Sequence, residues 1–250
     1  MLFTKGITED TESFRKKSRS SQMAKNNLEE AYDNISNVIY QAVLNPHLDK
    51  EMLVQIFDAS KQNGFGGLCT SLSHLSIARE RLGAKSTTKL ISVIAFPFGF
   101  IPTSNKLKEA EYAIEKGAEE LDFVPNYFAL REGNIDIFAE EINQLSELGL
   151  PTRVILDTNT LLTSSKLTSV INASIDAGAT GIQIGNGFGP ALTKNQTQKI
   201  SEIVKNRVSI KAVGGIKTYN QAIEIMEAGS TYIGTSFGFE INKEQKKKDK

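Results

Sequence analysis

The sequence predicts an α/β protein with the fold of a (β/α)8 TIM barrel, in a single domain with an N-terminal helical extension. Short runs of β-branched and apolar residues recur about every 23 to 33 residues, and an amphipathic stretch follows each run. Nearly continuous apolar strands that alternate with helices indicate a parallel sheet covered on both faces. Seven or eight such units in about 210 residues favour a closed barrel over an open doubly wound sheet. No G-x-G-x-x-G motif follows the first strand to favour the open fold.

The two ends of the chain differ from its middle. Residues 1–34 are polar and charged, and we expect an extension that is partly disordered or helical. A helix is expected from about Ala24, because Leu28, Tyr32 and Ile35 have helical spacing. The barrel is expected over residues 35–240. Residues 241–250 predict a solvated, lysine-rich tail.

The strand-like runs define the barrel. The run Val38–Leu44 fits a strand or a helix. The clear runs are Gly67–Leu72, Lys89–Pro97, Glu120–Asn126, Thr152–Thr158, Gly181–Gly187, Ser209–Gly215 and Thr231–Ser236. Between them, stretches such as Lys106–Lys116 place apolar side chains on one helical stripe.

Composition excludes several classes of function. With 29 basic and 29 acidic residues, the chain lacks the basic excess of a protein that binds nucleic acid by bulk electrostatics. One cysteine, Cys69, excludes internal disulfides and indicates a reducing, cytoplasmic location. Two histidines, His47 and His74, are too few for a histidine-rich metal site. No apolar run is long enough to span a membrane, and no secretory signal is expected.

Two charged residues lie inside apolar strand runs. Asp122 lies in Leu121–Asn126, and Lys211 lies in Ser209–Gly215. A buried charge costs several kcal/mol unless it is paired. We therefore expect Asp122 and Lys211 to form an ion pair from neighbouring strands of the barrel. An ion pair that only stabilises the fold is the alternative.

Glycine-bearing strand ends predict a phosphate site. Gly214 and Gly215 end one late strand, and Gly234 and Ser236 end the next. Phosphate sites in these barrels are often formed by the last loops, where backbone N–H groups face the anion. Gly187 follows an earlier strand and leaves room for a ligand near the backbone.

From about Ile35 to Gly238 the sequence resembles the deoxyribose-phosphate aldolase family. The resemblance rests on motifs in colinear order: Val93–Gly99, Glu109–Glu111, Gly117–Asp122, Ala177–Ala179, Gly187–Gly189, Lys211–Tyr219, Glu227–Gly229 and Ile233–Ser236. It implies a class I aldolase that needs neither metal nor cofactor. Such an enzyme cleaves 2-deoxyribose 5-phosphate to glyceraldehyde 3-phosphate and acetaldehyde, in deoxynucleoside catabolism. A phosphorylated sugar is then the expected partner, and a homodimer the expected assembly.

The family's catalytic groups map onto three positions. The proton-shuttling aspartate matches Asp122, and the second lysine matches Lys211. The position of the Schiff-base lysine holds Gln183, whose amide nitrogen cannot form an imine. Without a second ammonium, and with Asp122 favouring its charged form, Lys211 is expected to be a poor nucleophile.

Three functions remain open at this point. The first is an aldolase in which Asp122 and Lys211 move protons. The second is a non-catalytic barrel that binds a phosphorylated sugar. The third is enolisation or isomerisation without an imine, with Asp122 as base and Lys211 stabilising an oxyanion. Further departures from the family lie at Tyr40, Ala42, Asn45, Pro125 and Phe237.

Overall fold

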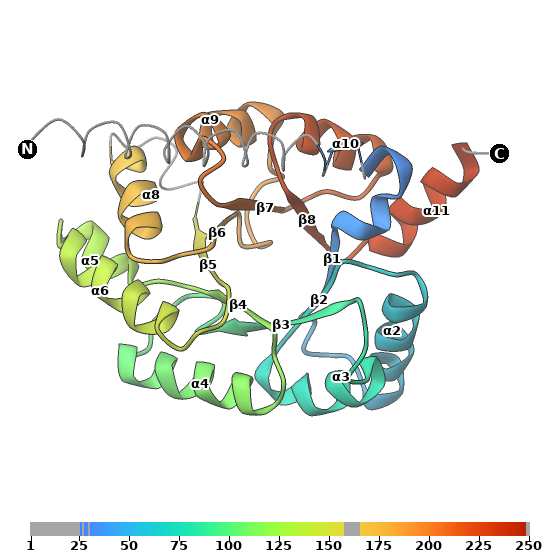
Figure 1. Ribbon diagram of the computed structural model, residues 1–250, viewed down its shortest axis with the longest axis horizontal. Coiled ribbons are helices and arrows are strands. Elements are labelled where there is room, and N and C mark those ends of the chain that lie inside the picture. The colour runs from blue at the N-terminus through green and yellow to red at the C-terminus, as the bar shows by residue number, and fades with distance from the viewer. Residues whose placement is uncertain (1–25, 27, 30, 158–165, 249–250) are drawn as a thin grey trace, which may run out of the picture.

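The computed structural model describes residues 26, 28, 29, 31–157 and 166–248, and these form a closed eight-stranded barrel surrounded by helices (Figure 1). Each strand pairs in parallel with the next along the chain, and the last pairs with the first. The predicted (β/α)8 barrel is therefore confirmed. The main apolar core lies between the sheet and the helices that cover it.

The strands follow the predicted order but end earlier than the apolar runs do. They are β1 (Ile39–Val43), β2 (Gly67–Thr70), β3 (Lys89–Ile94), β4 (Glu120–Phe123), β5 (Thr152–Leu156), β6 (Gly181–Ile184), β7 (Ser209–Val213) and β8 (Tyr232–Thr235). The ambiguous run Val38–Leu44 forms β1, because its residues pair with both β2 and β8 and close the barrel. Among the described residues, those that follow the strand in each run lie at the carboxyl end of that strand.

The helices cover the outside of the barrel. They are α2 (Lys50–Gln62), α3 (Leu75–Leu82), α4 (Thr103–Glu115), α5 (Tyr127–Arg131), α6 (Ile135–Ser146), α8 (Leu167–Asp176), α9 (Lys194–Val204), α10 (Tyr219–Glu227) and α11 (Gly238–Lys248), with short 3-10 turns η1 (Ile35–Val38) and η2 (Leu72–His74). Thr193 and Thr218 cap α9 and α10 with reciprocal side-chain and backbone hydrogen bonds. These caps fix where the two late loops turn into helices.

The residues just before the barrel pack against helix α11. Most of the expected extension, residues 1–25, lies outside the described residues, and residues 31–33 are helical, with Ala31 buried. The expected tail 241–250 begins inside helix α11, which differs from a solvated tail. Its lysines 246–248 are exposed as expected, but Gln245 is buried and accepts a hydrogen bond from the backbone N–H of Ile35 at 2.8 Å. Contacts distant in sequence therefore hold this segment as a helix.

A glycine makes room for a large aromatic side chain inside the barrel. Tyr40 on β1 is 2% exposed, and its register partners are Gly67 on β2 and Gly234 on β8. A β-carbon at Gly67 would lie 2.7 Å from Cδ1 of the Tyr40 ring. The ring therefore occupies space that a side chain on β2 would otherwise fill.

Candidate active site

Asp122 and Lys211 meet inside the barrel. Nζ of Lys211 donates to Oδ2 of Asp122 at 2.5 Å, and both side chains are almost completely buried. The predicted ion pair is confirmed. The expectation that it joins neighbouring strands is wrong, because β5 and β6 lie between β4 and β7. The long lysine side chain reaches Asp122 across the interior.

A second cation extends this pair into a network. Nε of Arg153 on β5 donates to Oδ1 of Asp122 at 2.6 Å, and Nη1 of Arg153 lies 2.6 Å from Oε2 of Glu120. Glu120 also accepts a hydrogen bond from Nζ of Lys89 at 2.7 Å, near the amino-terminal ends of β3 and β4. Sequence analysis missed Arg153 and Glu120, although Arg153 gives the same signal as Asp122, a charge inside an apolar strand.

The two cations hold Asp122 in its ionised form. Burial acts to raise the pKa of Asp122, but Arg153 and Lys211 together bring it below its ordinary value. The same cations face the Tyr40 ring, whose centroid lies 5.1 Å from Cζ of Arg153 and 5.5 Å from Nζ of Lys211. Burial first, and then Glu120, raises the pKa of the Tyr40 hydroxyl above its usual range. The interior therefore contains two carboxylates, two cations and a neutral phenol.

Gln183 lies beside this network. It is the register partner of Lys211 on the adjacent strand β6 and is 4% exposed. Its Nε2 donates to the carbonyl oxygen of Gly185 at 3.1 Å, whereas its buried Oε1 has no hydrogen-bond partner among the described residues. The position that holds the amine in the family's pattern thus presents an amide acceptor to the interior.

The expected phosphate-binding residues line one cavity at the carboxyl ends of the strands. This cavity has a volume of about 650 Å³, and its lining includes all five of them: Gly187, Gly214, Gly215, Gly234 and Ser236. Lys217, which sequence analysis did not single out, lines the same cavity. It follows Gly214–Gly215 in the same motif, and its ammonium adds positive charge where an anion is expected.

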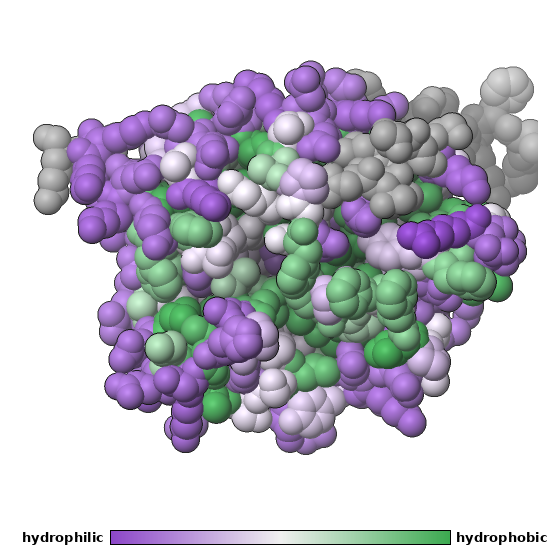
Figure 2. All heavy atoms as spheres, turned by 180° about the vertical axis from the view of Figure 1, so that it is seen from behind, coloured by the Kyte–Doolittle hydropathy of each residue, from purple (hydrophilic) through white to green (hydrophobic). Residues whose placement is uncertain are grey.

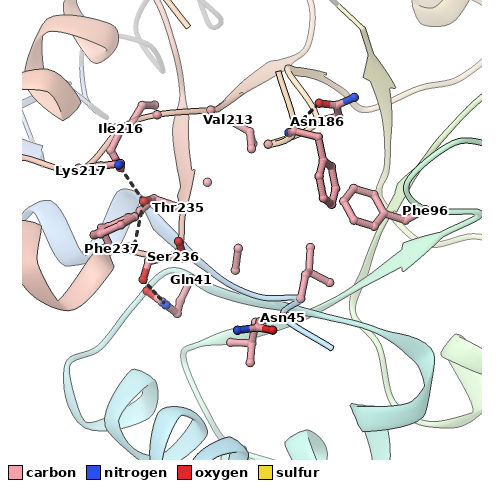
Figure 3. Close-up of a pocket in the computed structure, with 18 of the residues that line it drawn as sticks. Gln41, Asn45, Phe96, Asn186, Val213, Ile216, Lys217, Thr235, Ser236 and Phe237 are labelled. Carbon is pink, nitrogen blue, oxygen red and sulfur yellow. Dashed lines mark hydrogen bonds between the residues drawn. The ribbon is translucent and has the colours of Figure 1, made fainter. Parts of the chain in front are cut away.

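Gln41 fixes the turn that carries Ser236. Its Nε2 donates to the carbonyl oxygen of Ser236 at 3.1 Å (Figure 3). Its Oε1 accepts from the backbone N–H of Gly238 at 3.1 Å. Thr235 donates to the carbonyl oxygen of Ile216 at 2.6 Å and so ties the ends of β7 and β8 together. These bonds hold the two late loops in one arrangement around the cavity.

The ion network lies directly behind the wall of the cavity. Asp122, Lys211 and Gln183 are not among the residues that line it. Gly234 does line it, and a β-carbon at Gly234 would lie 2.8 Å from Cε of Lys211. Gly234 therefore brings the cavity lining close to the lysine side chain.

Cys69 gives a first testable prediction. Its thiol is buried and donates to Oδ2 of Asp122 at 3.7 Å. Burial raises the pKa of this thiol to about 12, although Lys211 acts in the opposite direction. Because the thiolate is the reactive form, we expect iodoacetamide at pH 8 to modify the native protein at least about 100-fold more slowly than the urea-unfolded chain. Equal rates, followed by intact mass, would show that the interior is open to reagents.

Within the part of the chain that the structure describes, no group of three or more His, Cys, Asp or Glu side chains is arranged to hold a metal ion. No helix among the described residues is long and apolar enough to cross a membrane.

A closed parallel barrel with a buried Lys–Asp pair behind a glycine-lined cavity defines a (β/α)8 protein of the aldolase class. The chain is 35% identical over 213 residues to the deoxyribose-phosphate aldolase of Thermococcus gammatolerans, covering 83% of this chain and 94% of that one. It is 36% identical over 208 residues to the enzyme of the same name from Trichormus variabilis, covering 83% and 91%. The chain belongs to the deoxyribose-phosphate aldolase family.

Solved structures agree with this assignment. An aldolase designated QR15 superposes with a TM-score of 0.80 at 31% identity, covering 86% of this chain and 97% of that one. The deoxyribose phosphate aldolase of Aeropyrum pernix, described as a tetramer, superposes with a TM-score of 0.78 at 27% identity, covering 90% and 96%. No protein-family model matches the chain.

Proposed function

We propose that this protein acts on 2-deoxyribose 5-phosphate as an aldolase, with Lys211 as the amine that forms the Schiff base. The family supports this proposal, since the curated relatives carry the name deoxyribose-phosphate aldolase. The observation that carries it is the position of Lys211 beside Gly234, where an added β-carbon would lie 2.8 Å from Cε of Lys211, since Gly234 lines the cavity expected to bind the phosphate.

In the proposed reaction, the amine of Lys211 is first freed and then bonds to the sugar. The Lys211 ammonium first gives a proton to a base and turns from Asp122 towards the cavity. Its nitrogen then bonds to the aldehyde carbon of the open-chain sugar, and the carbonyl oxygen leaves as water with one proton from this nitrogen and one returned by the protonated base. The resulting iminium takes up the electron pair when the carbon–carbon bond breaks, while the sugar hydroxyl at the departing carbon loses its proton and glyceraldehyde 3-phosphate leaves. The enamine left on the lysine takes up a proton at carbon, and water hydrolyses the iminium to acetaldehyde and the free amine.

Asp122 is the base nearest to this ammonium, and its lowered pKa makes the first proton transfer unfavourable. Where a second ammonium lies beside the lysine, like-charge repulsion lowers the pKa of its amine, and the loss of this proton does not have the same cost. We therefore expect imine formation to be slower here than in relatives that keep two lysines.

Borohydride trapping tests the proposal. The protein is incubated with 2-deoxyribose 5-phosphate, reduced, and examined by intact mass and peptide mapping. We expect a stable adduct on Lys211, absent from the Lys211→Met variant. An adduct confined to Lys217, which lines the cavity, would reject Lys211 as the amine. No adduct in any peptide would reject the imine itself.

A second function is favoured by the ion network. Lys211 is held at 2.5 Å by an ionised carboxylate, and Gln183 supplies no amine. Both features suit a barrel that binds the phosphorylated sugar without cleaving it. Binding of 2-deoxyribose 5-phosphate in calorimetry, together with no borohydride adduct, would select this function over the first.

The proposal includes a cytoplasmic location, supported by a single cysteine that is a free thiol in the structure. A homodimer stays a prediction. A tetramer is described for the Aeropyrum pernix relative.

A further inference from the structure

The cavity has two chemically different ends. One end has the glycine-bearing turns after β7 and β8, together with Lys217. The other has the aromatic rings of Phe96 and Phe188, whose centroids lie 5.7 Å apart. Figure 3 shows Phe96 across the cavity from Ser236 and Phe237. A ligand that spans the cavity therefore meets an anion-binding region and an aromatic wall.

Phe188 is a large apolar side chain that is exposed where it lines the cavity. It is 68% exposed at the edge of the cavity, although its ring packs against Phe96. Figure 2 looks onto this face and shows apolar side chains gathered near its middle. Exposed apolar groups that cluster at a cavity often mark a ligand-binding surface.

The loop that carries Phe188 is fixed before any ligand arrives. Gly185 has φ +84°, and a β-carbon there would lie 2.0 Å from the carbonyl oxygen of Val213, so the loop packs directly on the end of β7. The side chain of Asn186 accepts a hydrogen bond from the backbone N–H of Phe188 at 3.0 Å. A loop held in this way loses little backbone freedom when a flat group packs on the ring that it carries.

Phe96 is held equally well. Its neighbour Ala95 donates its backbone N–H to Oε2 of Glu109 at 2.7 Å, which ties the start of this loop to α4. Phe96 also packs against the buried cluster of Tyr40, Cys69, Ile91 and Val93 inside the barrel. The aromatic wall is thus continuous with the core.

The volume of the cavity also favours a ligand larger than a pentose phosphate. This volume of about 650 Å³ corresponds to roughly 20 water molecules of the liquid, which is more than a pentose phosphate fills. We propose that this cavity binds a phosphate monoester that carries a flat aromatic group, with the phosphate at the glycine-bearing turns and the flat group against Phe96 and Phe188. This inference rests on the proposed function, because it uses the same phosphate end.

Calorimetric titration of the full-length protein tests this proposal with three probes: 2-deoxyribose 5-phosphate, deoxyadenosine 5′-monophosphate and deoxyadenosine. Stacking of a base on an aromatic side chain typically contributes enough free energy for a fivefold or larger change in affinity. We therefore expect the nucleotide to bind at least about fivefold more tightly than the sugar phosphate. Deoxyadenosine, which lacks the phosphate, should bind more weakly than the nucleotide.

Two variants locate the aromatic contact. Phe188→Ala removes an exposed ring and should lower the affinity for the nucleotide towards that for the sugar phosphate, with Phe96 keeping part of the difference. Phe100→Ala is the matched control, because Phe100 is 83% exposed and is not among the cavity residues. It should change neither affinity.

Each contrary result has a distinct meaning. Equal affinity of the nucleotide and the sugar phosphate, or no effect of Phe188→Ala, would overturn this inference and leave the proposed function intact. Deoxyadenosine that binds as tightly as the nucleotide would also overturn it. If the sugar phosphate and the nucleotide both fail to bind, the proposed function fails as well.

Discussion

Replacement of Gln183 by lysine is expected to raise the rate of 2-deoxyribose 5-phosphate cleavage by at least about 100-fold, the lower range for one well-placed catalytic group. Gln183 and Lys211 are register partners on adjacent strands, so the new amine would lie beside the existing one. The buried Asp122 and Glu120 are already matched by Arg153 and Lys211. The ammonium of a lysine at position 183 would have no counter-charge. The neutral form of one amine is therefore favoured in the pair formed with Lys211.

The measurement is the steady-state cleavage rate, combined with borohydride trapping and peptide mapping to locate the adduct at position 183. Gln183→Met is the matched control, since it has a similar length without an amine and should stay at the wild-type rate. An adduct at 183 without faster cleavage would show that the departures at Tyr40, Ala42 and Phe237 have altered the cavity as well. No adduct at 183 would show that this position does not reach the substrate.

Asp122→Asn is expected to lower the free energy of unfolding by about 3–5 kcal/mol, the usual cost of removing one partner of a buried ion pair. Asp122 is 0% exposed and contacts both Arg153 and Lys211, so the neutral amide leaves two buried cations poorly compensated. Urea unfolding at pH 7 measures this change. Glu119→Gln is the control, because Glu119 pairs with Arg79 but its side chain is 44% exposed, and its loss should cost no more than about 1 kcal/mol.

The same substitution should change the response to acid. Because the pKa of Asp122 in the folded protein lies below the ordinary value of 3.8, the carboxylate stabilises the fold fully above that pH. This stabilisation is lost as the pH falls through the lower folded-state pKa. Urea titrations between pH 7 and pH 2 should show a component of acid destabilisation in the wild type that Asp122→Asn lacks. Parallel curves for the two proteins would contradict this role of Asp122.

Much of the fold and part of the site could be predicted from local patterns. Alternating apolar runs and amphipathic stretches identify the strands, because burial on both faces of a parallel sheet leaves a direct record in the residues. Asp122 and Lys211 were recognised because a charge inside an apolar strand needs a partner. The glycines of the late strands were recognised because the carboxyl ends of the last strands in such barrels often bind phosphate.

The remaining features depend on contacts between distant segments. Which charges meet inside the barrel depends on strand register, so the link from Arg153 to both Glu120 and Asp122 could not be derived from spacing. The reach of Lys211 across the interior, past β5 and β6, has the same origin. Helix α11 continues through a lysine-rich segment because its buried face packs on residues near the start of the barrel.

The sequence by itself determined the (β/α)8 barrel, the Asp122–Lys211 pair and the glycines of the late strands, because each is a property of residue type and periodicity. The loss of the amine at Gln183 followed from the resemblance of the sequence to the family. Only the tertiary structure decided that the pair lies behind Gly234, outside the cavity lining, that Tyr40 fills the space left by Gly67, and that Phe96 and Phe188 form an aromatic wall. The physical reason is that a closed barrel brings side chains from separate strands and loops together through its register and its loop conformations, which no local pattern specifies.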